Sequence, residues 1–262
     1  MITLTDVLKA TKGSCPGANP DTKIGELNFT GVSTDTRTIR PGELFIALQG
    51  DTFDGHAYVG QAAAKGAAAA VVSRPVETPS GLPQILVPDT LKAYQDIASF
   101  YRMSFPHLKV VAITGSNGKT STKDMIAAVL ATRGMIASVL AQKYKTHATE
   151  GNFNNEIGLP HTLLEITPTT EIAVTEMGMR GLGQIKAMCA FAKPDVAVIT
   201  NVGSTHVGEL GSLANIAKAK SEILEDLPQD GFAVLNGDLD LVIDPLIAAD
   251  QAAKLSNLQD EA

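Results

Sequence analysis

The chain has 262 residues and a formal net charge of −7, and 44% of its residues are hydrophobic while 19% are charged. This composition is typical of a soluble globular protein with one large domain or two smaller ones. The negative net charge is not offset by a basic stripe, which argues against general nucleic-acid binding. Cys15 and Cys189 lack Cys or His neighbours at metal-ligand spacing, so we expect free thiols in a reducing cytosol.

Residues 1–87 are predicted to form a small α/β domain. The segment opens with an amphipathic helical pattern at Leu4, Val7 and Leu8 rather than with a signal-peptide core. No apolar stretch of the sequence is long enough to span a bilayer, and we expect a cytoplasmic protein. Apolar runs predict strands at residues 44–48, 68–72 and 84–87, with a helix at 62–65.

Two loops of this domain concentrate polar side chains. They contain Ser33, Asp35, Thr36 and Arg37 in the first loop and Asp54 and His56 in the second. Such residues are common in turns, where Asp35 would bond the nearby backbone and pair with Arg37. The alternative is a ligand site at the strand ends, with Arg37 placed for an anionic group. The residues alone leave both alternatives open.

The second domain, predicted over residues 88–262, is organised around a glycine loop. A helix over 90–103 leads into a buried strand at 110–114, and a helical pattern follows the loop. The loop consists of Gly115, Ser116, Asn117, Gly118, Lys119, Thr120 and Ser121. Strand, glycine loop and helix in this order predict a nucleotide site, because backbone N–H groups and the helix N-terminus can surround phosphate. Lys119 would reach the β- and γ-phosphates, and the Thr120 hydroxyl would ligate Mg²⁺.

Further strands alternating with helices predict a mostly parallel sheet. We expect these strands at 136–140, 172–175 and 196–200, with a helix at 183–192. Ligands of such sheets bind at the carboxyl ends of the strands, a rule that selects Glu176 and His206. Each has an ordinary alternative, a carboxylate paired with Arg180 and a loop histidine. Beside a phosphate loop, a Mg²⁺ role is the better hypothesis for both.

A loop rich in asparagine precedes the helix that ends near Leu164. It contains Asn152, Asn154 and Asn155. These side chains either cap the following helix or hydrogen-bond a ligand. We favour the ligand, because three neighbouring amides are costly to bury without partners.

Lys220 lies on the apolar stripe of a helix predicted over residues 212–227, which includes Leu213. It follows Ile216 by four residues, whereas Lys218 points away from the stripe. Its ammonium could extend to water, or it could be held near the active site in a neutral or modified form. Beyond residues 233–237 the periodicity weakens, and the tail at 250–262 is predicted to be an exposed helix or a frayed end.

Together these motifs resemble the Mur ligase family of ATP-dependent peptide-bond-forming enzymes. The similar segments run from the N-terminus to about Asp238 and comprise residues 33–37, 50, 54–56, 114–121, 152–160, 176–178, 201–206 and 217–223. The asparagine loop, the Glu-Met-Gly at 176–178 and the Lys-x-Glu-Ile at 220–223 favour the member that adds D-alanyl-D-alanine over the member that adds the third peptide residue.

The resemblance implies a UDP-sugar-binding N-terminal domain and a P-loop NTPase-like central domain. ATP would convert the terminal carboxylate of a UDP-N-acetylmuramoyl-tripeptide into an acyl phosphate, which the amine of D-alanyl-D-alanine then attacks. By the same resemblance Lys119 stabilises the γ-phosphate, Thr120 and Glu176 hold one Mg²⁺, His206 holds a second, and Lys220 is carbamylated by CO₂.

The resemblance also favours substrate contacts by the polar loops of the first domain, Thr36, Arg37 and His56 above all. Family members continue into a C-terminal domain that binds the incoming amino component, so these 262 residues are expected to match the front half of such an enzyme, with an incomplete central domain. Two alternatives stay open: another amide ligase of the superfamily, such as a folylpolyglutamate-like enzyme, and a non-catalytic fragment that binds nucleotide and UDP-sugar. We expect a monomer.

Overall fold

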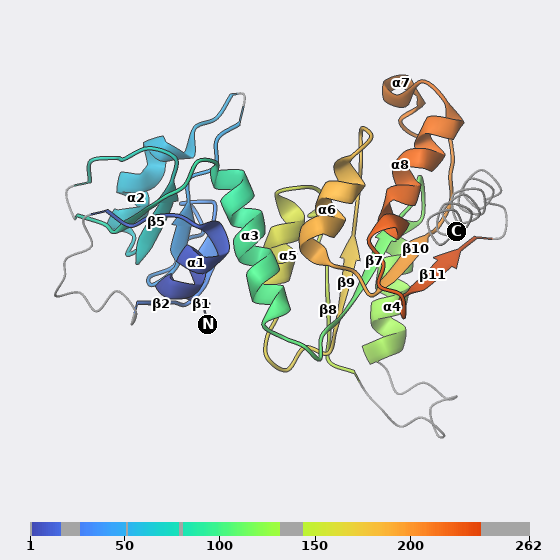
Figure 1. Ribbon diagram of the computed structural model, residues 1–262, viewed down its shortest axis with the longest axis horizontal. Coiled ribbons are helices and arrows are strands. Elements are labelled where there is room, and N and C mark those ends of the chain that lie inside the picture. Colours follow the sequence, from blue (N-terminus) through green and yellow to red (C-terminus); the bar gives the residue numbers. More distant parts are fainter. Residues whose placement is uncertain (1, 17–26, 51, 79–80, 132–143, 237–262) are drawn as a thin grey trace, which may run out of the picture. The chain divides into compact units, whose positions relative to one another are not determined.

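A computed structural model of the chain describes residues 2–16, 27–50, 52–78, 81–131 and 144–236 (Figure 1). Over these residues the chain divides into two compact units, which fall within Met1–Pro106 with Pro160–Pro168 and within His107–Leu159 with Thr169–Ala262. Each unit has its own parallel sheet, so the predicted α/β class is confirmed. None of the helices in the described ranges is long and apolar enough to cross a membrane.

The first unit is built on a four-stranded parallel sheet in the order β3-β4-β5-β6. The strands of this unit are β1 (Ile2–Thr3), β2 (Asn28–Phe29), β3 (Val32–Ser33), β4 (Leu44–Ile46), β5 (Ala69–Val72) and β6 (Gln84–Leu86). Its helices are α1 (Leu4–Thr11), the short 3-10 helix η2 (Gly55–Tyr58), α2 (Val59–Ala64) and α3 (Thr90–Met103). β1 and β2 form a separate antiparallel pair.

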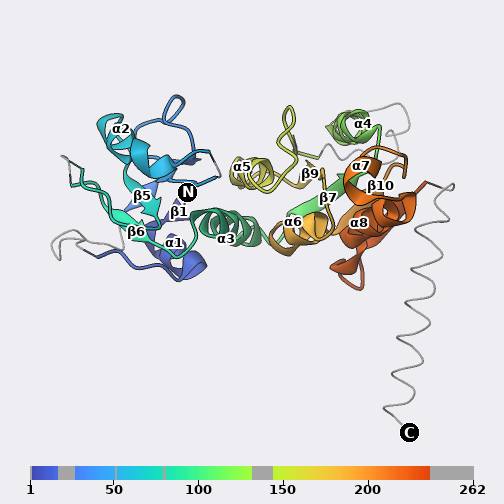
Figure 2. The same ribbon diagram turned by 90° about the horizontal axis from the view of Figure 1, so that it is seen from above.

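Alternating side chains give the first sheet two buried faces. Leu44 and Ile46 pack into one core cluster with residues of α1 and α3. Phe45, which lies between them in sequence, packs into a second cluster with Val59 and Ala62 of α2. Helices therefore cover both faces, with α2 on one side and α1 and α3 on the other (Figure 2).

The second unit contains a five-stranded sheet in the order β11-β10-β7-β9-β8, and every neighbouring pair is parallel. Its strands are β7 (Lys109–Thr114), β8 (Thr146–Ala148), β9 (Ile172–Glu176), β10 (Val196–Ile199) and β11 (Phe232–Leu235). The remaining helices of the described residues are α4 (Lys119–Ala131), α5 (Gly158–Leu164), α6 (Gln184–Ala192), α7 (Val207–Leu210) and α8 (Leu213–Glu225).

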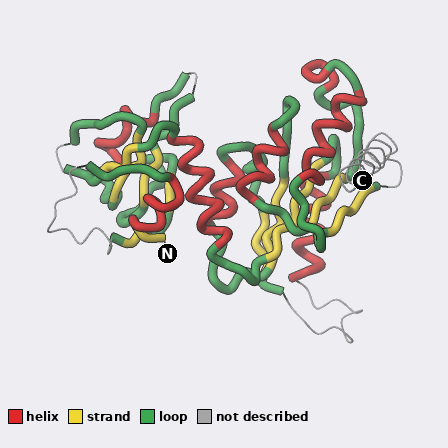
Figure 3. Tube along the Cα trace, in the orientation of Figure 1, coloured by secondary structure: helices red, strands yellow, loops and turns green. Residues whose placement is uncertain are grey.

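The register of this sheet brings three strand ends to one edge. Ile113 pairs with Glu176, and Thr114 pairs with Ile199, so β7, β9 and β10 end side by side. α4 covers one face, whereas α6 and α8 lie next to each other on the other face (Figure 2). Helices and strands alternate along this part of the chain (Figure 3), as the sequence predicts.

Some boundaries differ from those expected. The first compact unit extends past residue 87, because α3 packs against α1 and contributes Tyr94 and Ile97 to the same core. β8 was not expected, since Thr146–Ala148 is short and only half-buried. Leu213 is 44% exposed, because it opens α8 and burial on this helix begins at Ile216. The strand predicted at 136–140 and the tail at 250–262 lie outside the described residues.

Candidate functional site

The glycine loop joins β7 to α4, as its sequence predicts. β7 ends at Thr114 and α4 begins at Lys119. Gly118 has a φ of +76°, a left-handed conformation that glycine adopts without a steric penalty. A Cβ atom on Gly115 would lie only 1.9 Å from the Thr200 hydroxyl oxygen. Gly115 itself has a φ of +156°. Backbone conformation therefore favours glycine at both positions, and the close approach of Thr200, the residue after β10, also requires it at Gly115.

The segment after β10 holds the loop by five hydrogen bonds. Ser116 N–H donates to the Asn201 carbonyl (3.1 Å), and Asn117 N–H donates to Asn201 Oδ1 (2.8 Å). The Thr200 hydroxyl donates to the Asn117 carbonyl (2.6 Å). Ser116 Oγ donates to the Gly203 carbonyl (3.0 Å) and accepts from Gly203 N–H (2.8 Å). These bonds fix the loop conformation before any ligand arrives.

Two of the predicted site residues meet directly at the sheet edge. The Thr120 hydroxyl donates to Glu176 Oε2 at 2.9 Å, and Asn154 Nδ2 donates to Glu176 Oε1 at 2.8 Å. Glu176 is 3% exposed. Lys119 Nζ donates to the carbonyl of Gly115 at 3.0 Å. A buried carboxylate bound by two neutral donors thus lies next to the loop, and the alternative pairing with Arg180 is not among the ion pairs of the described residues.

Lys123 and Thr149 extend this site, and neither was predicted from the sequence. Lys123 Nζ donates to the Thr149 carbonyl (2.5 Å), while Thr149 Oγ1 accepts from the Glu176 N–H (3.1 Å). Lys123 is 5% exposed. It follows Lys119 by four residues, so both lysines share one face of α4, and this spacing is the signal that could have identified it.

Lys220 is buried, which agrees with its place on the apolar stripe and argues against the alternative in which its ammonium extends to water. It is 2% exposed, whereas Lys218 is exposed. Burial and, after it, the positive charge of Lys119 lower the pKa of Lys220 to about 8. The Lys220 ammonium therefore lies near enough to the glycine loop to be repelled by Lys119. No described residue forms a hydrogen bond or an ion pair with it.

His206 lies in the segment that follows β10 and directly precedes α7. Its φ is +70°, and its Nδ1 lies 3.8 Å from Glu209 Oε1. The structure therefore connects His206 to the glycine loop through the backbone of the 200–206 segment, and no side-chain contact among the described residues joins it to Glu176. Its predicted Mg²⁺ role stays a prediction.

The asparagine side chains of the 152–155 loop were expected either to cap the following helix or to bind a ligand, and the structure shows a different environment for each. Asn155 Oδ1 accepts from Ile157 N–H and Gly158 N–H, so it caps α5. Asn154 instead points its amide at Glu176. Asn152 contributes its carbonyl to Asn154 N–H (2.7 Å). Capping thus accounts for Asn155, and substrate contacts by these asparagines stay a prediction.

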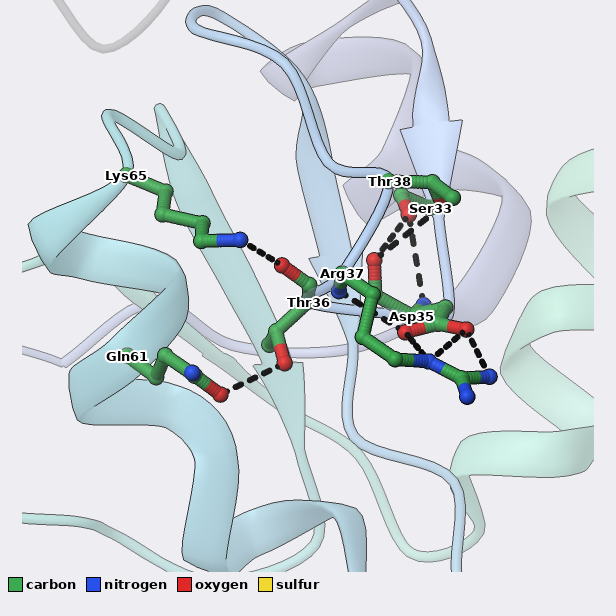
Figure 4. A network of polar contacts seen from close by, with 7 residues as sticks. All are labelled: Ser33, Asp35, Thr36, Arg37, Thr38, Gln61 and Lys65. Atoms are coloured by element: carbon green, nitrogen blue, oxygen red, sulfur yellow. Dashed lines mark hydrogen bonds and ion pairs between the residues drawn. The ribbon is translucent and has the colours of Figure 1, made fainter.

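In the first unit, Arg37 is paired with Asp35 (Figure 4). Arg37 Nη2 and Nε both donate to Asp35, at 2.6 and 2.9 Å for Oδ2. The hydrogen bond from Arg37 is the main cause that holds the pKa of Asp35 below its usual range. Ser33 Oγ accepts from Asp35 N–H (3.2 Å). The turn chemistry that the sequence allows is therefore present, and it leaves the 87% exposed Arg37 side chain with free donors at the surface.

The neighbouring Thr36 points the opposite way, toward α2 (Figure 4). Its hydroxyl donates to Gln61 Oε1 (2.7 Å), and its carbonyl accepts from Lys65 Nζ (2.7 Å). Thr36 is 6% exposed. These two partners lie on and just after α2, and they hold the loop that presents Arg37.

His56 is buried, and both of its ring nitrogens are engaged. Nε2 accepts from Ser73 N–H at 2.9 Å, which places the proton on Nδ1, 2.7 Å from Asp54 Oδ1. Arg74 Nη2 also pairs with Asp54, at 2.5 Å to Oδ2. His56 therefore joins the loop after β4 to the end of β5. It shapes the surface near Arg74 rather than offering a ring nitrogen of its own.

The residues around Glu176 fit a divalent cation. In the described part of the chain no three His, Cys, Asp or Glu side chains converge as a metal-binding group. Mg²⁺, however, is commonly bound by one or two protein oxygens together with water and nucleotide phosphates. The Thr120 hydroxyl and the Glu176 carboxylate provide such oxygens beside the phosphate loop.

Comparisons with family models cover most of the chain. A model described as "Mur ligase middle domain" matches residues 113–256, and one described as "Mur ligase family, catalytic domain" matches residues 28–102. Curated proteins with the name UDP-N-acetylmuramoyl-tripeptide–D-alanyl-D-alanine ligase are similar. The protein from Synechocystis is 45% identical over 84% of this chain and 46% of its own length, and the protein from Bacillus subtilis is 45% identical over 90% and 49%.

Solved structures give the same result. A crystal structure of MurF from Acinetobacter baumannii has a TM-score of 0.82 with 34% identity, over 95% of this chain and 52% of that protein. MurF ligase from Thermotoga maritima in complex with ADP has a TM-score of 0.68 with 32% identity, over 80% and 46%. The chain therefore spans about half the length of the curated relatives it matches.

Proposed function

The chain belongs to the Mur ligase family, and from this premise we propose that it acts in ATP-dependent peptide ligation during peptidoglycan precursor synthesis. The reaction joins D-alanyl-D-alanine to a UDP-N-acetylmuramoyl-tripeptide. The observation that supports this proposal most strongly is the contact between the Thr120 hydroxyl and the buried Glu176 carboxylate, at the edge of the sheet where the glycine loop opens α4. Because ATP and UDP-linked precursors are cytoplasmic metabolites of the proposed reaction, we place the protein in the cytoplasm, and we propose that it is a monomer.

The second unit would position ATP for phosphoryl transfer. The N-terminus of α4 and the loop N–H groups that Asn201 does not bind would face the phosphates, and Lys119 would exchange its bond to the Gly115 carbonyl for the γ-phosphate. Thr120 and Glu176 would hold one Mg²⁺ and His206 a second; Mg²⁺ supplies charge neutralisation on the transferring phosphoryl group. Asn154 holds the Glu176 carboxylate directly, whereas Lys123 holds Thr149, whose hydroxyl accepts from the Glu176 backbone N–H.

The proposed reaction has two balanced steps. An oxygen of the tripeptide carboxylate attacks the γ-phosphorus of ATP, the bond to ADP breaks, and an acyl phosphate forms. The D-alanyl-D-alanine amine then attacks the acyl carbon, inorganic phosphate leaves, and the amine loses a proton as the amide forms. Such transfers depend on positioning and on charge stabilisation more than on covalent catalysis by the protein.

Lys220 would enter this site as a carbamate. Its neutral amine attacks CO₂ and loses a proton, so that a cation becomes a carboxylate. The support for this hypothesis is the burial of Lys220 and its proximity to Lys119, since two ammonium groups beside phosphates and Mg²⁺ would compete. A carbamate would instead pair with Lys119 or face the metal.

The first unit would bind the UDP-sugar part of the precursor. Arg37 has exposed donors for an anionic group, while Ser33, Asp35 and Thr36 fix the turn that presents it. His56 would act from behind this surface by fixing Asp54 and the end of β5. The asparagines of the 152–155 loop lie in the second unit, where Asn154 is closest to the proposed carboxylate chemistry.

Calorimetric titration with UDP-N-acetylmuramoyl-tripeptide tests this proposal. We expect the wild-type chain to bind it and Arg37→Ala to weaken binding by about 10-fold or more, because loss of a charge-assisted contact costs at least ~1.4 kcal/mol. Arg40→Ala, an exposed arginine three residues away, is the matched control and should bind normally. Binding of folate in place of the UDP-linked peptide would contradict the proposal and favour a folylpolyglutamate-like ligase.

A further inference from the structure

Helix α6 begins without a capping side chain of its own. Its N-cap residue is Gly183, which has a φ of +82° and offers no side-chain acceptor. The first N–H groups of a helix have no partners within that helix, and they carry the positive end of its dipole. α6 follows directly on the segment that leaves Glu176 at the end of β9, so its start also fixes the end of that segment.

Glu222 of α8 supplies the missing cap from outside. Its Oε1 accepts from Gly183 N–H at 2.6 Å, and its Oε2 accepts from Lys186 N–H at 3.1 Å. The residue is 6% exposed. Both oxygens of a buried carboxylate are thus bound by backbone donors at a helix N-terminus, the environment that stabilises a negative charge most effectively.

The same two helices carry a second, different ion pair. Lys186 Nζ lies 2.7 Å from Glu225 Oε2, with side chains that are 60% and 44% exposed. This pair joins flexible side chains at the surface and contributes little to geometry. Glu222, in contrast, binds two backbone N–H groups of α6 and its entrance, so it constrains how α8 is rotated and shifted along its axis relative to α6.

Lys220 depends on that rotation. Residues two apart on a helix differ by about 200° in direction, so Lys220 lies on the opposite side of α8 from Glu222, which points toward α6. Lys220 is 2% exposed there, and α8 packs against β7 and β10 of the sheet. Gln184 fixes the other part of the α6 entrance, because its Oε1 accepts from Arg180 N–H (2.6 Å) and Gly181 N–H (3.2 Å). Glu222 and Gln184 together connect the segment after Glu176 to the helix that carries Lys220.

We propose that Glu222 is a positioning residue of the metal site: its carboxylate locks α8 onto the N-terminus of α6 and so sets the separation between Lys220 and Glu176. This inference rests on the proposed function, because it concerns the Mg²⁺ that Thr120 and Glu176 would hold. It explains why a buried glutamate stands two positions after Lys220, although Glu222 itself contacts neither the phosphate loop nor Glu176. Groups that orient metal ligands in this indirect way typically change metal affinity or activity by about 10- to 100-fold when they are replaced.

The test measures Mn²⁺ binding by electron paramagnetic resonance in the presence of ADP and bicarbonate. Glu222→Gln keeps the shape of the side chain and one acceptor but loses the charge and the second acceptor. We expect it to weaken Mn²⁺ binding by about 10-fold or more, while ADP binding in EDTA stays unchanged, because the glycine loop is held by the segment after β10. Glu225→Gln removes the same charge from the same helix and should leave Mn²⁺ affinity within about 2-fold of wild type.

Each outcome decides the question. If Glu222→Gln lowers only the melting temperature and binds Mn²⁺ like wild type, Glu222 is merely structural and the inference is wrong. If Glu222→Gln does not fold, Glu222→Asp is compared with Glu225→Asp, and equal Mn²⁺ affinities in that pair would overturn it. If wild type itself binds no Mn²⁺ with ADP, the proposed function fails first and this inference falls with it.

Discussion

The close approach of Thr200, the residue after β10, to the glycine loop makes Gly115→Ala an informative substitution. A Cβ atom at this position would lie 1.9 Å from Thr200 Oγ1, 3.1 Å from Thr200 Cβ and 3.3 Å from Asn201 N. Contacts under 3.0 Å are essentially never seen for real Cβ atoms, so the Thr200 hydroxyl must move. It cannot move without breaking its 2.6 Å hydrogen bond to the Asn117 carbonyl.

Alanine is strained at the Gly115 φ of +156°, and the clash with Thr200 adds two further costs. Losing the hydrogen bond from Thr200 costs about 1 kcal/mol, and forcing a methyl group against the side chain and the Asn201 backbone costs about 1–3 kcal/mol. We therefore expect Gly115→Ala to lower the free energy of unfolding by at least about 2–4 kcal/mol. The displaced loop should also bind nucleotide about 10-fold more weakly or worse, since a misplaced loop loses at least ~1.4 kcal/mol of phosphate contacts.

Urea denaturation followed by circular dichroism measures the loss of stability, with the m-value as a check that the same structure unfolds. Thr200→Ala alone should cost only about 1 kcal/mol, the value of its hydrogen bond. The double variant should cost less than the sum of the two, because the hydroxyl that clashes is gone. A Gly115→Ala variant within about 0.5 kcal/mol of wild type, or strictly additive costs, would refute the close approach of Thr200 to this glycine.

Three further predictions concern side chains with distinct partners. Asn154→Ala removes a donor from Glu176 and should weaken Mn²⁺–ADP binding by about 10-fold, measured by calorimetry, with Asn155→Ala changing helix stability instead. The pKa of Asp54 is held well below its usual 3.8, first by Arg74 and then by His56. The ionised Asp54 therefore stabilises the folded state above pH 3.8, and this stabilisation is lost as the pH falls through the lower, folded-state pKa. In an acid denaturation series, the difference in the free energy of unfolding between wild type and Asp54→Asn should narrow below about pH 4. Burial raises the pKa of Cys189 to about 12, so in a Cys15→Ser variant at pH 8 a thiol reagent should react only after denaturant is added.

Elements with strong local signals were predictable from the sequence. α3 has the predicted bounds, because its apolar spacing is regular and Asp89 caps it by accepting from Leu91 N–H and Lys92 N–H. The buried strands β7, β9 and β10 are short β-branched runs with clear ends. β8 escaped prediction since an edge strand of three half-buried residues lacks both alternation and an apolar run.

The site was predictable where chemistry is encoded in one segment. The glycine loop has its own motif, and the stripe position of Lys220 is visible in the spacing of its helix. The rule that ligands bind at strand ends selected Glu176 correctly as a neighbour of Thr120. The roles of all these residues in binding nucleotide, metal or substrate stay predictions, and for His206 and Asn152 the described residues show no side-chain contact with Glu176 either.

Partners from distant segments could not be predicted in this way. Asn154 contacts Glu176, Lys123 contacts Thr149, and Glu222 contacts the start of α6. Each of these contacts joins elements that are distant in sequence and meet only in the folded unit. Sequence spacing predicts which residues of one helix or strand lie on the same face. Hydrogen bonds between different elements depend on sheet order and register, which spacing does not predict. In the first unit, likewise, the sequence did not predict that Thr36 bonds Gln61 and Lys65 or that His56 bonds Asp54 and Ser73.

The central claim is that the loop from Gly115 to Ser121 binds the phosphates of ATP, with Lys119 as their main cationic contact. Calorimetric titration of wild type and Lys119→Ala with MgATP tests it most directly, with Lys218→Ala, an exposed lysine, as the control of equal charge. We predict that wild type and Lys218→Ala bind alike and that Lys119→Ala binds about 10-fold more weakly or worse, a loss of at least ~1.4 kcal/mol. Equal affinity of Lys119→Ala and wild type would contradict the assignment of this loop as the nucleotide site.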